Sequence, residues 1–469
     1  MAARGPLLLG ISLMVGACAS GPQLPAAAEL PPPPASAPSV AAVASQVSMT
    51  GPAGQAIGPR QREQVIEAVQ AQGRGEALKR QLGAMAAFGD VGLYPGNEAG
   101  LLIDGPATYK AMFEAIQRAR HTVLLESYII EDAEVSRRLA ALLAAKRAEG
   151  LGVFVVYDAV GSIGTQDAFF AALREAGVAT CAFNPLGQLD DLTHRDHRKI
   201  LVVDRETGFT GGINISAVYS SGSLGRHRRA PPPQDPDGKR TGWRDTQVQL
   251  RGPAVSALDD LVRQTWRDQK CEGTLPPPPA VPKKAAGEQL LRIIPTTPDD
   301  PVNRFYTMMM GAIAASQQSV LLTMAYFAPG EDMVDALCEA ARRGVDVQLV
   351  LPSRSDFSPV LHAGRSYYAR LLDAGVKIHE LQDSVLHAKT VVIDGVVASV
   401  GSSNLDQRSF TGNNEINAVV IGEDFGAAMR RMFEQDLKDS REITQAAWRS
   451  RSLWQRSKEF FARVFERLW

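Results

Sequence analysis

The sequence predicts an α/β protein of two similar lobes that are related by a pseudo-twofold axis. Three observations lead to this fold class. The chain has 469 residues, more than one ordinary domain requires, and 45% of them are hydrophobic, enough for a substantial core. Buried-strand patterns alternate with amphipathic helical patterns. The second half of the chain then repeats the order of the first half.

The repeat can be followed element by element. The strand pattern HTVLLESYII in the first half corresponds to QSVLLTMAYF in the second. The matching pairs are the strands 121–130 and 318–327, the helices 136–150 and 333–344, the strands 151–158 and 345–352, and the helix ends with short strands 172–180 and 369–378. Strands that alternate with helices favour parallel pairing, so we expect each lobe to be a mainly parallel mixed sheet flanked by helices.

Proline-rich stretches mark the boundaries between these units. LPPPPASAP near the N-terminus predicts a semi-extended tether, TLPPPPAVPKK predicts a linker, and the basic stretch 225–242 predicts a long loop. We expect a signal peptide at 1–17, a lipidated cysteine with an Ala/Pro-rich tether at 18–75, lobe 1 at 85–272, the linker at 273–287, lobe 2 at 288–445 and an amphipathic helix at 446–469.

The N-terminus has the pattern of an export signal. One arginine precedes an apolar run too short to cross a bilayer as a mature helix, and small residues lead to Cys18. VGAC resembles the bacterial lipobox, in which the cysteine becomes the lipidated first residue. The alternative is an ordinary cleaved signal peptide that ends near a cysteine. No acid follows Cys18, so the resemblance favours an exported protein anchored by lipid to the outer membrane, on its periplasmic face.

Three further cysteines are Cys181, Cys271 and Cys338. An exported protein could pair two of them, and the sequence leaves the pairing open. Their spacing is not that of a metal site.

A short motif recurs in both halves. HRKILVVD places His197, Lys199 and Asp204 at the same spacing as His387, Lys389 and Asp394 in HAKTVVID. A small-residue turn with an asparagine follows each motif. Further on, WRDTQVQLRG aligns with NNEINAVVIG. These segments supply one amide and one acid to each half: Asn214 and Asp245 in the first, Asn404 and Glu415 in the second.

Strand parity separates the roles of these residues. Side chains alternate along a strand, so the histidine and lysine of each motif share a face, whereas the acid seven positions after the histidine does not. We therefore expect Asp204 and Asp394 to hold a turn or pair with a cation there. Asp245 and Glu415 are the better candidates to bond the Nδ1 atoms of the histidines.

Paired histidines, lysines and amides in one cleft predict chemistry on a phosphodiester. One imidazole would attack phosphorus, and the other would protonate the leaving alcohol and then deprotonate the incoming one. Lysines 199 and 389 and asparagines 214 and 404 would stabilise charge on the phosphate oxygens. We expect neither a metal ion nor an organic cofactor.

These motifs resemble those of the phospholipase D superfamily, and within it the chain is similar to bacterial cardiolipin synthases of the phospholipase D type. The second half carries the resemblance best, in LHAKTVVIDG and GSSNLDQRSFTGNNEIN, and the first half adds LESYII, GGINIS and WRDT. The resemblance covers about Gly89 to the C-terminus. It implies that both motifs form one active site, with His197 as the nucleophile and His387 as the acid and base.

The resemblance also implies a phospholipid substrate. We expect phosphatidyl transfer between two phosphatidylglycerols, and hydrolysis to phosphatidic acid is the nearest alternative. A nuclease fits less well, because the net charge is −1 and basic residues occur only in short clusters, so we expect no nucleic-acid partner. A non-enzymatic membrane scaffold would tolerate loss of a catalytic residue, and both motifs are intact. We expect a monomer with an internal pseudo-dimer.

The C-terminal segment predicts an amphipathic helix. Trp454, Phe461, Phe465 and Leu468 share one helical face, with Arg and Lys abundant elsewhere. This face could lie against the surface of an anionic membrane or pack on the lobes, and the sequence leaves both possibilities open.

Overall fold

The computed structural model describes residues 36–87, 91–185, 193–222, 242–280 and 284–466, together with residues 24 and 187. The predicted signal peptide, Cys18, the first part of the tether, nearly all of the basic loop 225–242 and Leu468 lie outside these residues.

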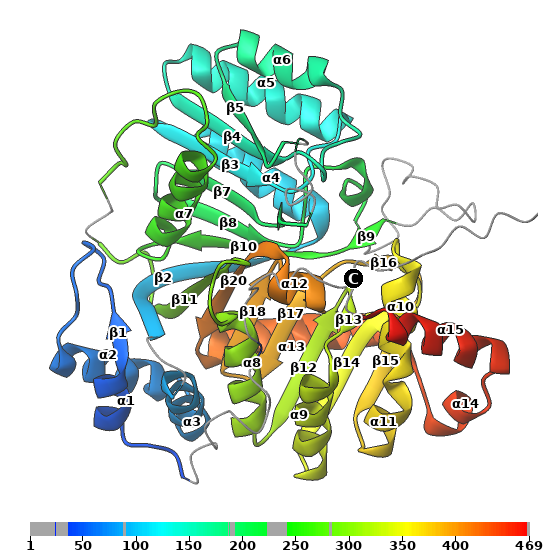
Figure 1. Ribbon diagram of the computed structural model, residues 1–469. Helices are drawn as coiled ribbons and strands as arrows, with labels where there is room; N and C mark the ends of the chain where they lie inside the picture. Colours follow the sequence, from blue (N-terminus) through cyan, green and yellow to red (C-terminus); the bar gives the residue numbers. More distant parts are fainter. Residues whose placement is uncertain are drawn as a thin grey trace, which may run out of the picture.

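Lobe 1 is a mixed sheet with the strand order β5-β4-β3-β7-β8-β10-β2 (Figure 1). The pairs β3–β4 and β4–β5 are parallel and the other neighbours are antiparallel. Its strands are β2 (Val91–Ile103), β3 (Thr122–Ser127), β4 (Gly152–Asp158), β5 (Ala179–Phe183), β7 (Lys199–Val203), β8 (Thr207–Gly211) and β10 (Thr246–Arg251).

Lobe 2 repeats this sheet with the order β15-β14-β12-β17-β18-β20-β11. Its strands are β11 (Gln289–Thr296), β12 (Ser319–Met324), β14 (Asp346–Pro352), β15 (Lys377–Leu381), β17 (Lys389–Ile393), β18 (Val397–Gly401) and β20 (Asn413–Ile421). The pairs β12–β14 and β14–β15 are again the parallel ones. Antiparallel pairing of β2 with β11 joins the two lobes. The predicted α/β class with two equivalent lobes of mixed sheet is confirmed, but in each sheet the antiparallel neighbours outnumber the parallel ones, because short connections such as those between β7 and β8 and between β17 and β18 join antiparallel strands.

Helices cover both faces of each sheet because the strands are apolar on both faces. In β3, Val123 and Leu125 face the core formed with α4 (Asp104–Gln117), α5 (Glu134–Ala148) and α6 (Asp167–Glu175), whereas Leu124 faces the opposite side. In β12, Val320 and Leu322 face α8 (Arg304–Ala315) and α9 (Glu331–Arg342), and Leu321 faces the opposite side.

The opposite sides of the two sheets meet in one shared apolar core. Leu124 and Leu321 both belong to it, together with residues of α7 (Val255–Asp268) and α13 (Glu423–Lys438). In α7 the buried residues Val255, Leu258, Val262 and Trp266 recur at helical spacing and form the face that enters this core. The lobes are therefore held together by apolar packing as well as by the β2–β11 pair.

The predicted N-terminal tether is wrong for the residues from 40 onward, which are folded. Residues up to 75 were expected to be extended, but α1 (Val40–Gln46), β1 (Val47–Met49) and α2 (Pro59–Ala71) are folded, and α3 (Gly75–Ala86) follows them. Their buried apolar residues, among them Val43, Ile66 and Leu82, join the core of lobe 2, and β1 pairs with β2. The proline and alanine content of this segment obscured these residues, which lobe 2 buries although the segment is too short for a core of its own.

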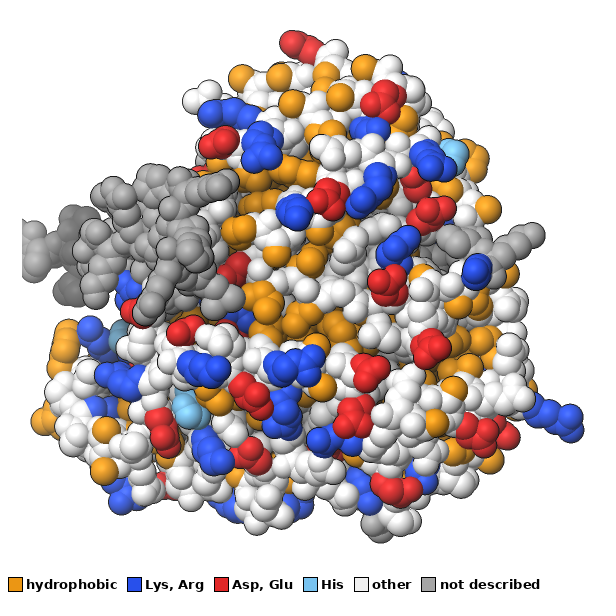
Figure 2. Space-filling view, turned by 180° about the vertical axis from the view of Figure 1, so that it is seen from behind, with side chains coloured by type: hydrophobic (Ala, Val, Ile, Leu, Met, Phe, Trp, Pro, Cys, Tyr) orange, Lys and Arg blue, Asp and Glu red, His pale blue; other side chains and the backbone are white. Residues whose placement is uncertain are grey.

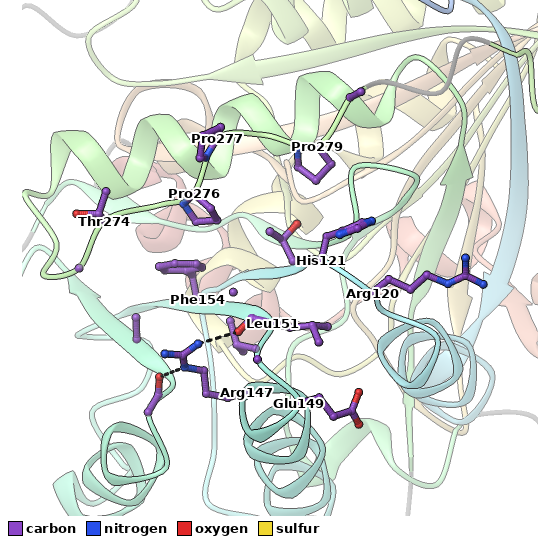
Figure 3. A pocket seen from close by; sticks show the side chains of 18 residues that line it. Arg120, His121, Arg147, Glu149, Leu151, Phe154, Thr274, Pro276, Pro277 and Pro279 are labelled. Atoms are coloured by element: carbon purple, nitrogen blue, oxygen red, sulfur yellow. Dashed lines mark hydrogen bonds between the residues drawn. The ribbon is translucent and has the colours of Figure 1, made fainter.

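A disulfide resolves the cysteine pairing that the sequence left open. Cys181 of β5 is bonded to Cys271, which follows α7, and Cys338 is free and buried in α9. The linker begins directly after this bond and has no helix or strand among its described residues. Its prolines 276, 277 and 279 form one wall of a hollow of about 890 Å³ opposite Phe154 and Leu151 (Figure 3).

The C-terminal helices are α14 (Gln445–Arg449) and α15 (Leu453–Val464), and α15 packs on α10 (Ser358–Ser366) of lobe 2. The apolar face of this segment does not pack on the lobes, which was one of the two possibilities left open by the sequence. Its described residues Trp454, Phe461 and Phe465 are 69%, 61% and 49% exposed. Among the helices of the described residues, none is both long and apolar enough to span a bilayer.

Candidate active site

The two motifs are brought together by an exchange of short strands between the lobes. β6 (Arg195–Asp196) of lobe 1 pairs with the start of β20 in lobe 2, and β9 (Trp243–Arg244) of lobe 1 pairs with β16 (Val385–Leu386) of lobe 2. As a result, the backbone N–H of His197 donates to the carbonyl of Asn414 at 2.9 Å, and that of His387 donates to the carbonyl of Arg244 at 2.8 Å. Each histidine is therefore positioned by backbone from the other lobe.

The histidines and their carboxylates are paired across the lobes. Nδ1 of His197 lies 3.0 Å from both carboxylate oxygens of Glu415, and Nδ1 of His387 lies 2.7 Å from Oδ2 of Asp245. Both acids are fully buried. The Nδ1 contacts that strand parity predicts are present, and their crossing between lobes is a feature that sequence reasoning did not find. With Nδ1 bonded to an acid, Nε2 of each ring is the atom left for chemistry.

A glycine makes room for one of these acids. A Cβ atom at Gly212, in the turn after the first motif, would lie 2.1 Å from Oδ1 of Asp245. Any side chain at this position would displace the carboxylate that holds His387, so the Gly-Gly pair at 211–212 is more than a turn signal.

Both histidines line one cavity of about 390 Å³ between the lobes. Asn214 and Asn404 line it too. Sequence reasoning missed most of the remaining wall, although LESYII and WRDT contain two of its aromatic residues. The wall residues not singled out from the sequence are Tyr128, Ile129, Tyr219, Trp243, Tyr326, Asp356, Phe357, Val360, Asp406, Arg408, Ser409 and Asn413.

The two asparagines differ in their partners. Nδ2 of Asn214 donates to the hydroxyl of Tyr219 at 3.2 Å, and its Oδ1 accepts from the backbone of Ile129. This amide therefore has one hydrogen engaged in positioning Tyr219, whose hydroxyl lies 3.2 Å from Nδ1 of His387. Oδ1 of Asn404 is buried and has no hydrogen-bond partner among the described residues.

The two lysines are buried beneath the histidines. Nζ of Lys199 donates to the carbonyl of His197 at 2.5 Å, and Nζ of Lys389 donates to the carbonyl of His387. Neither lysine is part of the cavity wall in this structure. Burial lowers the pKa of Lys199 to about 7 and also lowers the pKa of Lys389.

The environment of the two imidazoles is not symmetric. Burial lowers the pKa of His197 well below its ordinary value, and the nearby cations Lys199 and Lys389 lower it further. Burial and Lys389 also lower the pKa of His387, but the charge and hydrogen bond of Asp245 oppose this change. Burial raises the pKa of Glu415 to about 7. His387 is therefore the better proton carrier of the two.

The acids that complete the motifs lie away from the imidazoles. Asp204 has φ 55° and accepts the backbone N–H groups of Arg120, His121 and Thr122 at 2.7, 2.7 and 2.8 Å. Asp394 has φ 51°, and its carboxylate accepts hydrogen bonds from the backbone N–H groups of residues 317–319 and from Nε2 of Gln81. The expectation that these acids hold turns is confirmed.

Asp204→Asn is expected to lower stability and to spare the chemistry. The substitution removes a carboxylate that accepts three backbone N–H groups, so we expect a loss of about 2 kcal/mol in the free energy of unfolding. Denaturant unfolding measures the loss, and kcat measured well below the midpoint should stay within about threefold of the original. A fall in kcat as large as that of a histidine variant, in protein that is still folded, would show that Asp204 acts on substrate.

The architecture and the cavity together define the class of protein. Two equivalent α/β lobes that each supply one histidine to a shared cavity, with a buried lysine bonded behind each histidine, have the arrangement of a phospholipase D-type enzyme.

Comparison with known proteins identifies the family. Residues 309–437 match the family model "Cardiolipin synthase, PLD-like domain". Cardiolipin synthase A of Pseudomonas fluorescens is 37% identical over 79% of this chain and 75% of its own length. Cardiolipin synthase 2 of Bacillus anthracis is 34% identical over 79% of this chain and 70% of its own length. The chain belongs to the cardiolipin synthase family of the phospholipase D superfamily and is a phospholipase D-type transferase.

The fold has a counterpart among solved structures. The crystal structure of a phosphatidylserine synthase from Haemophilus influenzae superposes with a TM-score of 0.57 at 12% identity, over 79% of this chain and 93% of the other. At this identity the likeness concerns the fold alone.

Proposed function

We propose that this protein forms cardiolipin from two phosphatidylglycerols, with release of glycerol, through a covalent phosphohistidine. The observation that carries the proposal is the pair of imidazoles from opposite lobes in one cavity, each with Nδ1 on a buried acid and with Nε2 not hydrogen-bonded to any residue that the structure describes. The relatives named cardiolipin synthase support the substrate.

In the first step, Nε2 of His197 attacks the phosphorus of the first phosphatidylglycerol. A P–N bond forms, the P–O bond to glycerol breaks, and the leaving oxygen takes the proton from Nε2 of His387. The stronger depression of the pKa of His197 supports this assignment, because a nucleophile must be unprotonated. The acid partner must enter the step with a proton, which Asp245 favours on His387.

In the second step, Nε2 of His387 accepts the proton of a hydroxyl on the second phosphatidylglycerol. The hydroxyl oxygen attacks phosphorus, the P–N bond breaks, and His197 is regenerated. Protons and bonds balance without any further reactant. If water takes the place of the second lipid, the product is phosphatidic acid.

The cations and amides supply charge stabilisation in both steps. Lys199 and Lys389 place two positive charges directly behind the histidines, in a buried setting where their field is weakly screened. Asn404 lines the cavity and is the better placed of the two asparagines to donate to a phosphate oxygen, because Nδ2 of Asn214 already donates to the hydroxyl of Tyr219. Asn214 acts mainly by holding Tyr219.

The pH dependence of kcat/KM is expected to be a bell centred near neutrality. Burial raises the pKa of Glu415 to about 7, so on the acid side its carboxyl gains a proton and can no longer accept Nδ1–H of His197. On the basic side His387, whose pKa burial lowers, loses the proton that the first step requires, and the ammonium of Lys199, whose pKa burial lowers to about 7, loses its charge. Because Glu415 and Lys199 interact, the apparent pKa values of the two limbs describe the pair and not either residue alone. Lys199→Arg, which stays charged, should move the basic limb to higher pH, and an unmoved limb would contradict the assignment.

Labelled phosphatidylglycerol tests the proposed reaction. Purified protein should yield cardiolipin and glycerol in equal amounts. If phosphatidic acid were the main product, the protein would be a hydrolase and not a synthase. Absence of turnover would exclude both functions.

We also propose export and lipid anchoring at Cys18, a residue outside the described part. The sequence pattern supports it, and acyl labelling that persists in Cys18→Ser would exclude this residue as the site.

A further inference from the structure

Exposed large hydrophobic side chains are concentrated in one region of the described residues. Six belong to the C-terminal helix or follow it directly, and we call them the α15 face: Leu453, Trp454, Phe460, Phe461, Val464 and Phe465. Two more are Ile163 and Phe357, each five residues after the last residue of the equivalent strands β4 and β14, Asp158 and Pro352. Among the described residues, Val302 is the one other large hydrophobic residue that is exposed in this way.

The helix α15 presents its apolar side outward and turns two of its charged residues, Glu459 and Arg463, toward the protein. Glu459 is buried and bonded to Arg451, and Arg463 pairs with Glu331 and stacks on a tyrosine ring. Glu466, just beyond the helix, accepts from the hydroxyl of Tyr367. An amphipathic helix ordinarily buries its apolar face on its own domain. Here polar bonds fix the helix in the reverse orientation, so the α15 face is left for an external apolar phase.

This helix is separated from the catalytic cavity by one layer of side chains. Ala462 of α15 packs with Val360 and Ala363 of α10, and Val360 lines the cavity that holds both histidines. Phe357, at the start of α10, lines the same cavity and is 40% exposed. On the lobe 1 side, the loop of Ile163 is bonded to the cavity wall, because Ser162 donates to the carbonyl of Tyr128. Exposed apolar side chains thus flank the cavity on both lobes.

Cations accompany the α15 face. Arg456 is exposed and donates to the carbonyl of Arg449, and Lys458 is exposed and stands over the ring of Trp454. The acids of the helix segment, Glu459 and Glu466, are turned toward the protein. In Figure 2, hydrophobic side chains lie beside basic ones at the edge of the molecule where α15 is found.

We propose that the α15 face docks on the surface of an anionic phospholipid bilayer and brings the catalytic cavity to the lipid headgroups. This inference rests on the proposed function, because a transferase whose two substrates are lipids needs its cavity at their surface. The partner is specified by the chemistry: aromatic and aliphatic side chains enter the interfacial region, and outward cations pair with anionic headgroups.

Binding to vesicles tests the proposal. The full chain carries Cys18→Ser throughout, so that no acyl group on this residue contributes to binding. The face variant combines W454S, F460S and F461S, the charge variant combines R456E and K458E, and the matched control is V302S, an exposed apolar residue of another surface. Sedimentation measures binding to vesicles of equimolar phosphatidylglycerol and phosphatidylcholine and to vesicles of phosphatidylcholine alone.

We expect the face variant to bind the mixed vesicles at least tenfold more weakly than the control. The charge variant should lose the preference for mixed vesicles, and added salt should reduce that preference in the unsubstituted chain. Equal binding by the face variant and the control would overturn the proposal. The proposal would also be overturned if the unsubstituted chain were a dimer, the face variant were a monomer, and the two bound vesicles equally. In that case a second copy of the chain would cover this face.

Turnover separates this inference from the proposed function. The His197→Ala chain should bind vesicles as the unsubstituted chain does, because docking requires no chemistry. If the unsubstituted chain turned over dispersed phosphatidylglycerol but did not bind the mixed vesicles, the docking surface alone would be overturned. Intact docking without turnover in the unsubstituted chain would overturn the proposed reaction alone.

Discussion

Replacing His197 with alanine is expected to abolish turnover, with a loss of at least about 10⁴-fold in kcat, because His197 is the group assigned to form the covalent intermediate. The imidazole is 12% exposed and lies at the cavity wall, so its removal should leave the cores intact. Steady-state assays on phosphatidylglycerol measure the loss, and thermal unfolding checks the fold. His121→Ala is the matched control, since this exposed histidine lies on a different hollow (Figure 3).

His387→Ala should fail in a different way. The first step needs a proton for an alkoxide leaving group, but a nitrophenol leaving group departs without one. On a phosphatidyl nitrophenol substrate, His387→Ala is therefore expected to release one equivalent of nitrophenol in a burst and then to stall. His197→Ala should give no burst. A burst from His197→Ala and none from His387→Ala would reverse the assigned roles.

Glu415→Gln and Asp245→Asn are expected to lower kcat by about 10²- to 10⁴-fold while KM changes little. Each acid accepts Nδ1–H of a histidine from the other lobe and fixes the tautomer that leaves Nε2 available. An amide of the same size can turn its NH₂ group toward Nδ1, which moves the ring proton to Nε2. Because both acids are buried, the amides also remove a buried charge, and the folded state should persist.

The control for these variants is Asp346→Asn, which removes a more exposed acid of lobe 2 paired with Lys377. Its kcat should stay close to that of the unsubstituted chain. Glu415→Gln should in addition lose the acid limb of the pH profile, since the carboxyl assigned to that limb is gone. If Glu415→Gln kept both full kcat and its acid limb, the crossed pair would be structural only.

The order of polar and apolar residues along the chain was sufficient to predict the fold class. It also predicted that the histidine and the acid of each motif have different roles. The alternation of side chains along a strand is set by backbone geometry, so the seven-residue spacing alone predicted that Asp204 lies away from the imidazole of His197. The repeat of strand and helix patterns likewise required no knowledge of distant contacts. These features depend on residues that are neighbours in the chain.

The tertiary structure decided everything that depends on how the lobes meet. Glu415 and His197 are 218 positions apart and Asp245 and His387 are 142 apart, so their crossed pairing follows from strand exchange between lobes. The disulfide, the burial of Val43 and Ile66 by lobe 2, and the outward apolar face of α15 have the same origin. An amphipathic pattern fixes which residues share a face, but the surface offered by the rest of the molecule determines which face is buried.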